Sequence, residues 1–265
     1  MRAMLLGAGL LMAATAGAQG GGGQGAKAKP EDTEQWSPDV PVVTPGAEAG
    51  RAAPSDAVVL FDGTNLDRWA SVKDGSAAQW PVADGAFTVR KGTGNIQTRQ
   101  SFGSYQLHLE FRIPTGITGE GQARGNSGLF LASTGKGDEG YELQIMDSYR
   151  NKTYVNGQAG SIYKQFAPLA NAARQPGEWQ SVDVVWTAPV FGADGAVKSP
   201  AYVTAQINGV LVQDHVAVRG QTTYIGQPRY VAHGPAPIKL QDHGDPSAPI
   251  SFRNIWIREL ARRAG

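Results

Sequence analysis

The chain has 265 residues, with 24 lysines and arginines against 23 aspartates and glutamates and a formal net charge of +1 at pH 7. Because the charge is close to zero and no basic cluster is present, nucleic acid is not an expected partner. The absence of cysteine excludes thiol catalysis, cysteine-ligated zinc and a lipid anchor on an N-terminal cysteine. After the first 20 residues, no segment reaches the roughly 18 apolar residues of a spanning helix, so we expect no membrane span.

The first 18 residues have the pattern of a secretory signal peptide. Arg2 gives a weak positive start, residues 4–14 are apolar, and the Ala-Gly-Ala that ends at Ala18 is a small-residue cleavage site. We therefore expect an exported protein, periplasmic or secreted.

Residues 19–54 are rich in glycine, alanine and proline and have no sustained period, which is typical of a flexible linker. Trp36 and the Val-Pro-Val-Val of residues 40–43 are apolar exceptions that can dock onto the domain that follows. Residues 55–262 are enough for one large domain.

Ten segments after residue 55 have the period-two alternation of β-strands. In the clearest, YQLHLEFRI at residues 105–113, odd-numbered positions carry large apolar side chains and even-numbered positions carry polar ones. Asn208-Gly209 lies between two of these segments and is a strong hairpin signal. Because such strands must bury their apolar faces against each other, we predict an all-β fold of two antiparallel sheets in a sandwich. The other nine predicted strands are residues 57–61, 86–90, 127–133, 141–147, 180–186, 202–207, 210–216, 238–241 and 250–257.

Polar residues in and beside these segments are candidates for a functional site. Glu142 and Gln144 share one face of a predicted strand, although an ordinary solvated sheet face is the commoner reason for such a pair. Asn126 lies where a turn is expected. Tyr163 and Lys164 lie in a loop, where packing and solvation are the usual roles of these residue types.

The segment IKLQDHG, residues 238–244, ends a predicted strand in Gln241, Asp242 and His243. His233 precedes His243 by ten residues in another turn-rich stretch. Two histidines with nearby carboxylates can bind a divalent ion or transfer protons. Their spacing is not that of a helical zinc motif, so spacing leaves both a divalent metal ion and simple turn scaffolding open.

The order of motifs along residues 57–260 resembles the 3-keto-disaccharide hydrolase family. The resemblance implies a jelly-roll sandwich of the concanavalin A-like lectin and glucanase type. It also implies an oligosaccharide or glycoside substrate with a ketone at carbon 3 of a sugar. The motifs that carry it are LFDGTNLDRW, GNSGLFL, YELQIMDS, GSIYKQFAP, PGEWQSVDVVW, INGVLVQD and PIKLQDHGDPSAPISFRNIWIREL.

A ketone at carbon 3 makes the hydrogen on carbon 2 acidic, because the carbanion is delocalised as an enolate. A base can remove that proton, the aglycone on carbon 1 leaves by elimination, and addition of water completes a net hydrolysis. A non-catalytic, lectin-like carbohydrate-binding module is the alternative from a different class. A conventional glycosidase would need two facing carboxylates, and only Glu142 stands out in the sequence.

The resemblance also implies that residues 55–262 form a catalytic domain. It further implies roles for the positions that match the family motifs. A divalent metal ion and the oligomeric state are left open. The implied catalytic residues are Glu142, His243 and Lys164, and the implied substrate-binding residues are Asn126, Gln144, Tyr163, Gln241 and Arg253.

Overall fold

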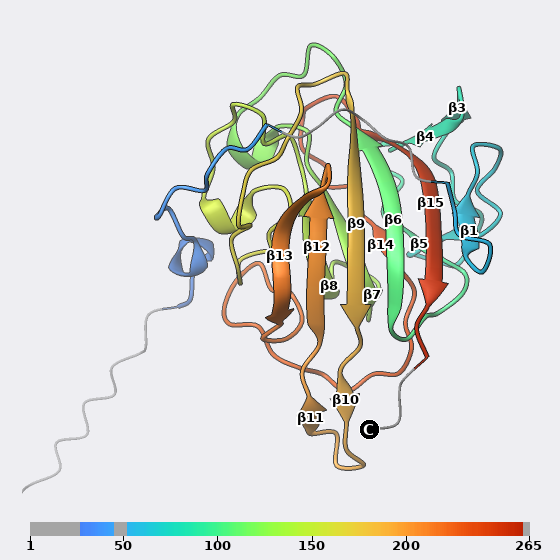
Figure 1. The fold of residues 1–265 in the computed structure, drawn as a ribbon, viewed down its shortest axis with the longest axis vertical. Coiled ribbons are helices and arrows are strands. Elements are labelled where there is room, and N and C mark those ends of the chain that lie inside the picture. The colour runs from blue at the N-terminus through green and yellow to red at the C-terminus, as the bar shows by residue number, and fades with distance from the viewer. Residues whose placement is uncertain (1–26, 45–51, 262–265) are drawn as a thin grey trace, which may run out of the picture.

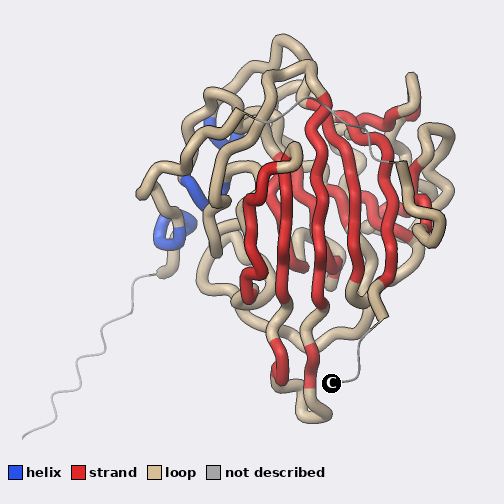
Figure 2. The backbone as a smooth tube through the Cα atoms, in the orientation of Figure 1, coloured by secondary structure: helices blue, strands red, loops and turns tan. Residues whose placement is uncertain are grey.

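The structure is a computed structural model that describes residues 27–44 and 52–261. The predicted signal peptide lies outside these residues, as do residues 19–26 and 45–51 of the predicted linker. Across the described ranges, no helix is long and apolar enough to cross a membrane. Figures 1 and 2 show strands in two layers, with loops gathered at the edges and at one end.

The strands and short 3-10 helices follow the chain as a long series of short elements. The strands are β1 (Val58–Phe61), β2 (Trp69–Ser71), β3 (Val82–Ala83), β4 (Ala86–Thr88), β5 (Ile96–Thr98), β6 (Tyr105–Arg112), β7 (Ser127–Ser133), β8 (Gly140–Ile145), β9 (Trp179–Thr187), β10 (Val190–Phe191), β11 (Val197–Ser199), β12 (Tyr202–Ile207), β13 (Val210–Ala217), β14 (Lys239–Leu240) and β15 (Ser251–Glu259). The 3-10 helices are η1 (Pro30–Thr33), η2 (Gly121–Ala123) and η3 (Val155–Gly157).

Two antiparallel sheets form the sandwich. The larger sheet has the order β13-β12-β9-β6-β15-β4-β3, with β1 also paired to β15, and the smaller has the order β2-β5-β14-β7-β8. A separate hairpin, β10-β11, extends from one end (Figure 1). The prediction of an all-β, two-sheet antiparallel jelly-roll sandwich is confirmed.

Each of the ten predicted strands overlaps an observed strand. The Asn208-Gly209 turn joins β12 to β13, and both residues have the positive φ, 53° and 78°, that a two-residue hairpin turn requires. The strands that the alternation did not predict are β2, β3, β5, β10 and β11, which have only two or three residues each. A pattern of period two cannot be recognised over so short a length.

The hydrophobic core lies between the sheets and follows the alternation of β6. Tyr105, Leu107 and Leu109 are fully buried on the inner face of this strand. The hydroxyl of Tyr105 donates a hydrogen bond of 2.6 Å to the backbone oxygen of Leu131 in the opposite sheet. One buried tyrosine therefore fixes the two layers to each other without leaving its polar atom unpaired.

The outer face of the larger sheet carries a buried polar cluster. His108 is fully buried, with Nδ1 2.9 Å from Asp183 Oδ1 and Nε2 3.5 Å from Glu110 Oε1, and its ring stacks on Trp256. Glu110 accepts a 2.6 Å hydrogen bond from Nε of Arg253. Burial opposes ionisation of Glu110, but the bonds from His108, the neighbouring asparagine and Arg253 outweigh it and lower the pKa of Glu110 to about 2.

Residues 27–44 lie against the sandwich and are not a free linker. Pro30–Thr33 forms η1, and Val42 makes a parallel β-bridge to Asn171. Trp36 contacts Tyr154 edge to face, with ring centroids 6.0 Å apart. Hydrogen bonds and one ring contact thus hold these residues on the sandwich and offset the entropy lost on ordering. Trp36 and Val42 nevertheless stay 56% and 81% exposed.

Candidate active site

The strand β8 presents its polar side chains on the outer face of the smaller sheet. Leu143 and Ile145 point into the core, while Glu142 and Gln144 point the other way, as the alternation predicts. Their side chains are nevertheless buried, with residue exposures of 5% and 1%. The expectation of an ordinary solvated sheet face is therefore wrong, because loops cover this part of the sheet.

One covering loop runs along the free edge of β8. The backbone N–H of Gln144 donates to the oxygen of Ser161 at 2.9 Å, and the N–H of Tyr163 donates to the oxygen of Glu142 at 3.1 Å. A second loop is attached through Thr222, whose hydroxyl accepts a 3.0 Å hydrogen bond from the N–H of Glu142. Both loops therefore form walls around the two polar side chains of β8.

The walls and the sheet enclose a cavity of about 310 Å³. It takes side chains from η2, from β8, from the ends of β7 and β14, and from the two covering loops. Its size suits one or two sugar rings. The lining residues are Gln122, Asn126, Asp138, Glu142, Gln144, Tyr163, Thr222, Tyr224, Gln241 and His243.

Gly128 makes the room in which the Glu142 carboxyl group lies. Gly128 pairs with Gln144 across β7 and β8, so it lies beside Glu142 on the sheet. A Cβ atom at Gly128 would be 2.5 Å from Oε1 of Glu142 and 3.1 Å from a ring carbon of Phe130. Any side chain at this position would displace the carboxyl group.

The Glu142 carboxyl group is in an environment that disfavours its charged form. Burial, and to a lesser extent the nearby charge of Asp138, raise its pKa to about 8, against the opposing effect of Lys239. The ammonium of Lys239 is itself held by the backbone oxygens of Gly137 and Glu139, at 2.6 and 2.8 Å. Near neutral pH, Glu142 therefore holds a proton that it can donate.

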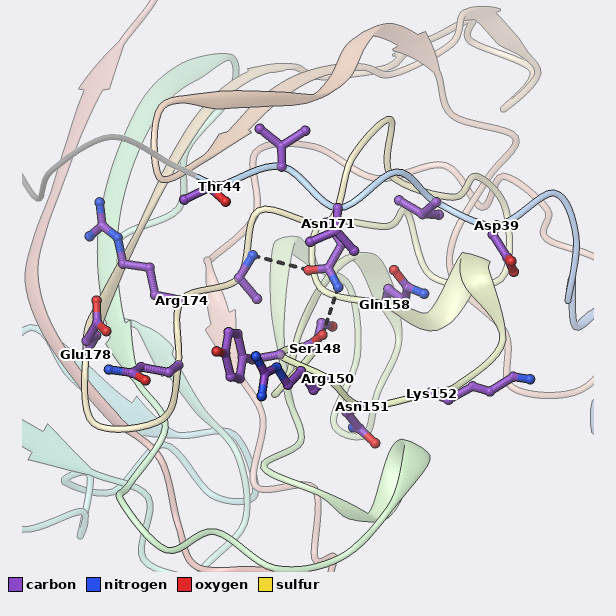
Figure 3. A pocket seen from close by; sticks show the side chains of 16 residues that line it. Asp39, Thr44, Ser148, Arg150, Asn151, Lys152, Gln158, Asn171, Arg174 and Glu178 are labelled. Atoms are coloured by element: carbon purple, nitrogen blue, oxygen red, sulfur yellow. Dashed lines mark hydrogen bonds between the residues drawn. The ribbon is translucent and has the colours of Figure 1, made fainter.

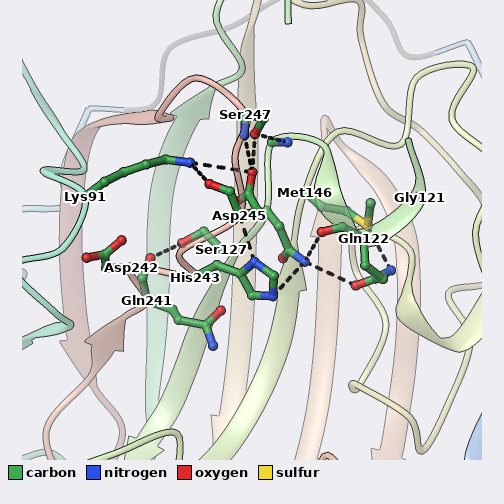
Figure 4. A network of polar contacts seen from close by, with 12 residues as sticks. Lys91, Gly121, Gln122, Ser127, Met146, Gln241, Asp242, His243, Asp245 and Ser247 are labelled. Carbon is green, nitrogen blue, oxygen red and sulfur yellow. Dashed lines mark hydrogen bonds and ion pairs between the residues drawn. The ribbon is translucent and has the colours of Figure 1, made fainter. Parts of the chain in front are cut away.

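An amide network joins β8 to His243, and Figure 4 shows the part of it between Gln122 and His243. Gln144 Nε2 donates to Oδ1 of Asn126 at 2.8 Å, which turns the Asn126 amide nitrogen towards Nε2 of His243, 3.2 Å away. The same nitrogen also reaches the backbone and side-chain oxygens of Gln122, at 2.8 and 3.2 Å. His243 Nε2 therefore faces the cavity as an acceptor. The hydrogen bond from Asn126 to this nitrogen can break while Asn126 keeps its bonds to Gln122.

The other ring nitrogen of His243 faces Asp245. Nδ1 lies 3.5 Å from Oδ2 of Asp245, whose other oxygen accepts hydrogen bonds from the N–H and hydroxyl of Ser247. Burial opposes ionisation of Asp245, but His243 and Ser247 outweigh it and lower its pKa to about 2. Lys91 completes the group with an ammonium 3.6 Å from the carboxylate (Figure 4). The negative charge of Asp245 fixes the tautomer and orientation of the His243 imidazole.

Asp242, next to His243, has a structural role. Its carboxylate accepts hydrogen bonds from the N–H groups of Gly92 and Gly94, at 2.7 and 3.1 Å, and its own N–H donates to Asn95 at 2.8 Å. Asp242 thus holds the loop before β5 beside the pocket. Of the two roles that the sequence left open for this segment, turn scaffolding is the one that Asp242 has.

The structure brings together six of the eight site residues implied by the resemblance. Lys164 does not line the cavity, because its ammonium binds the backbone oxygens of Pro30 and Tyr224, at 2.8 and 3.0 Å. Arg253 lies on the outer face of the other sheet, where its guanidinium is 4.1 Å from the Trp179 ring centroid. The six that line the cavity are Asn126, Glu142, Gln144, Tyr163, Gln241 and His243.

Four lining residues were not among those predicted. Asp138 lies in a glycine-rich turn, Gln122 lies in η2, and Thr222 and Tyr224 lie in a loop without strand pattern. Only the stretch around Gln122, TGITGEGQARGN, has a signal in the sequence, because its glycines are typical of a loop that can shape a cleft. The others are brought to the cavity by contacts between distant parts of the chain.

In the described part of the chain, no group of three or more His, Cys, Asp and Glu side chains is placed to hold a metal ion. The cavity has one imidazole, from His243, and two carboxyl groups, from Glu142 and Asp138. Asp138 accepts a 2.9 Å hydrogen bond from Asn95. His233, the other candidate ligand, instead faces the hydroxyl of Tyr141 at 3.0 Å.

A second, larger cavity of about 930 Å³ lies between residues 39–44 and the loops at 148–152 and 171–178 (Figure 3). Asn171 holds these loops together, because its amide nitrogen donates to Ser148 and its side-chain oxygen accepts from Ala173. None of the predicted site residues lines this cavity.

Fold and site together define a β-sandwich protein with a polar pocket on the outer face of its smaller sheet. The sequence model of the 3-keto-alpha-glucoside-1,2-lyase-like domain matches residues 56–258. The chain therefore belongs to this family. No protein with a curated description matches the chain.

Solved structures resemble this one. A candidate glycosyl hydrolase from Parabacteroides distasonis is 55% identical, with a TM-score of 0.76 over 87% of this chain and 96% of that chain. Another candidate glycosyl hydrolase from the same organism is 22% identical, with a TM-score of 0.54 over 77% of this chain and 99% of that chain. At this lower identity the likeness supports the fold alone.

Proposed function

We propose that the protein is an enzyme that cleaves the glycosidic bond of 3-keto-glycosides by elimination followed by addition of water. Family membership and the related candidate glycosyl hydrolases make it a carbohydrate-acting hydrolase or lyase. The observation that carries the finer proposal is the pairing of a buried, protonated carboxyl group at Glu142 with an imidazole acceptor at His243 in one cavity. Export of the protein stays a prediction from its first 18 residues.

In the proposed first step, Nε2 of His243 takes the proton from carbon 2 of the keto-sugar. The carbon–hydrogen electron pair moves into the enolate of carbons 2 and 3, and amide groups such as that of Gln241 donate hydrogen bonds to its oxygen. The enolate then forms a double bond between carbons 1 and 2. The bond from carbon 1 to the aglycone oxygen breaks, and that oxygen takes the proton of Glu142.

In the second step, water adds to the unsaturated keto-sugar. Its oxygen bonds to carbon 1, Glu142 takes a proton from it, and His243, after its imidazolium proton has exchanged with solvent, gives a proton to carbon 2. Both residues regain their starting state and the net reaction is hydrolysis. Asp245 stabilises the imidazolium that exists between the two steps.

A conventional glycosidase is the second candidate, because Asp138 adds a second carboxyl group to the cavity beside Glu142. Such an enzyme would use the pair as acid and as base or nucleophile on an unoxidised glycoside. A non-catalytic lectin-like module would bind sugars in the same cavity through Tyr163 and Tyr224 and turn over neither substrate.

The test compares a 3-keto-glucoside with its unoxidised parent, each with and without chelator, in deuterated water. We expect the keto compound alone to be cleaved, with deuterium at carbon 2 of the released keto-sugar. Cleavage of the parent would support the conventional glycosidase, and binding without cleavage would support the lectin-like module. Chelator sensitivity would reveal a required metal ion.

Replacement of Gly128 with alanine is expected to lower kcat/KM for the keto-glycoside by about 10- to 100-fold, since a misplaced catalytic group loses activity steeply. The added methyl group would displace the carboxyl group of Glu142. Gly103→Ala is the matched control, because a Cβ there meets no atom within 4 Å. Steady-state kinetics of both variants check this, and unchanged kinetics of Gly128→Ala would argue against a role for Glu142.

A further inference from the structure

Residues 29–36, here called the N-terminal strap, are bound by a fully buried asparagine of the domain. Asn156 Nδ2 donates to the backbone oxygen of Thr33 at 2.9 Å, and its Oδ1 accepts from the N–H of Gln35 at 2.9 Å. The N–H of Val155 donates to the oxygen of Gln35 at 2.6 Å. Both ends of the Asn156 amide are thus used on the strap, so this buried side chain depends on the strap for its polar partners.

Lys164 connects the strap to one aromatic side chain of the cavity. Its ammonium donates to the oxygens of Pro30 in the strap and of Tyr224, and it lies 4.6 Å from the centroid of the Tyr224 ring. The residue is only 6% exposed, so these partners replace the water that burial removes. The loop that carries Tyr224 is therefore fastened to the strap through a single cation.

A second connection reaches the other aromatic side chain of the cavity. Trp36 of the strap contacts Tyr154 edge to face, and the hydroxyl of Tyr154 is 2.6 Å from that of Tyr163. Tyr163 and Tyr224 both line the cavity. Two sets of contacts therefore lead from the strap to the two aromatic residues of the pocket. They meet at Lys164, whose ammonium also lies 5.6 and 6.0 Å from the ring centroids of Tyr154 and Tyr163.

We propose that the N-terminal strap completes the substrate pocket by holding Tyr163 and Tyr224 in place as its aromatic wall. Flat aromatic faces of this kind stack on the C–H face of a sugar ring. The strap precedes residue 56, where the family match begins. It would act on the binding of the keto-glycoside more than on proton transfer, and this kinetic part rests on the proposed function.

The likeness to the structural relative that is 55% identical extends beyond the family match. Its likeness covers 87% of this chain, whereas the 210 residues from 56 to 265 are about 79% of the 265. The similarity therefore reaches into residues before 56, beyond the match to the family.

Hydrogen exchange of the full chain tests the structural part without any substrate. Trp36→Ala removes the contact to Tyr154, and Asn156→Ala removes the two side-chain hydrogen bonds that hold the strap on the domain. Trp36 is 56% exposed, so its replacement leaves the core intact. We expect faster exchange in peptides that cover residues 154–164 and 222–226 in both variants. Val42→Ala is the control, because Val42 belongs to the part of the N-terminal segment that contacts Asn171 instead.

Steady-state kinetics with the 3-keto-glucoside test the functional part. We expect KM to rise about 5- to 30-fold in Trp36→Ala and Asn156→Ala, with kcat changed less than about threefold, as for loss of substrate binding alone. Val42→Ala is expected to match the unmodified chain. Unchanged exchange in both loops, or faster exchange with unchanged KM, would overturn the proposal. If the unmodified chain cleaves no keto-glycoside, the proposed function fails, while the exchange result still decides whether the strap holds the wall.

Discussion

Replacement of Glu142 with glutamine is expected to reduce kcat for the 3-keto-glucoside by about 10²- to 10⁴-fold, the usual contribution of a general acid. Glutamine has nearly the same shape but cannot donate a proton to the leaving oxygen. Because burial raises the pKa of Glu142 to about 8, the activity of the unmodified protein should fall as the pH rises through this value. The residual activity of the variant should lack this decline, which pH–rate profiles of both proteins would measure.

Glu142→Gln is expected to lower activity but to raise the stability of the protein relative to the unmodified chain at high pH. A carboxyl group with an ordinary pKa of 4.5 when unfolded and about 8 when folded favours the folded state fully below pH 4.5. That stabilisation is lost as the pH rises towards 8, because the folded protein binds more protons than the unfolded one. Glu142→Gln lacks this loss, so its Tm relative to that of the unmodified protein should increase between pH 5 and pH 9.

Glu259→Gln is the matched control for both measurements. Glu259 is exposed at the end of β15, where it accepts a 3.3 Å hydrogen bond from Gln100. It should leave both the pH–rate profile and the pH dependence of Tm unchanged. An active Glu142→Gln variant with the normal alkaline decline would show that another group donates the proton.

Replacement of His243 with asparagine is expected to reduce kcat by about 10²- to 10⁴-fold as well, through loss of the base that removes the carbon 2 proton. The decisive readout is exchange, because deuterium from the solvent should no longer enter carbon 2 of the substrate or product. NMR or mass spectrometry of the sugar in deuterated water measures this directly. Asp245→Asn should show a smaller loss, since it removes the charge that orients the imidazole and leaves the ring in place.

His215→Asn is the matched control for the histidine. His215 is exposed on β13, where its ring stacks on Tyr202 at a centroid distance of 4.5 Å. It should keep full activity and full exchange at carbon 2. If His243→Asn also kept both, the base would have to be another group, and the proposed first step would be abandoned.

Much of the fold could be predicted because the alternation of apolar and polar residues is a local property. On β8, the alternation placed Glu142 and Gln144 together on one face, and the structure agrees. The alternation could not predict that this face is buried. Its cover consists of loops whose bonds to the strand come from distant residues such as Ser161 and Thr222.

The site could be predicted only in part for the same reason. Family motifs identified Asn126 and His243, but nothing in the sequence separates these from Arg253, which the β15 pairing places on the opposite face of the sandwich. Gly128 reads as an ordinary strand glycine. Only its pairing beside Glu142 reveals that a side chain there would occupy the position of the carboxyl group.

The sequence by itself determined the all-β class, most of the strands, the hairpin turn and the family, since each depends on residues close together in the chain or on motifs in a fixed order. The tertiary structure decided which polar residues share a cavity, how far the pKa of Glu142 rises and where the N-terminal strap docks. These properties depend on which groups are removed from water and on which partners they then meet. Packing of distant segments sets both.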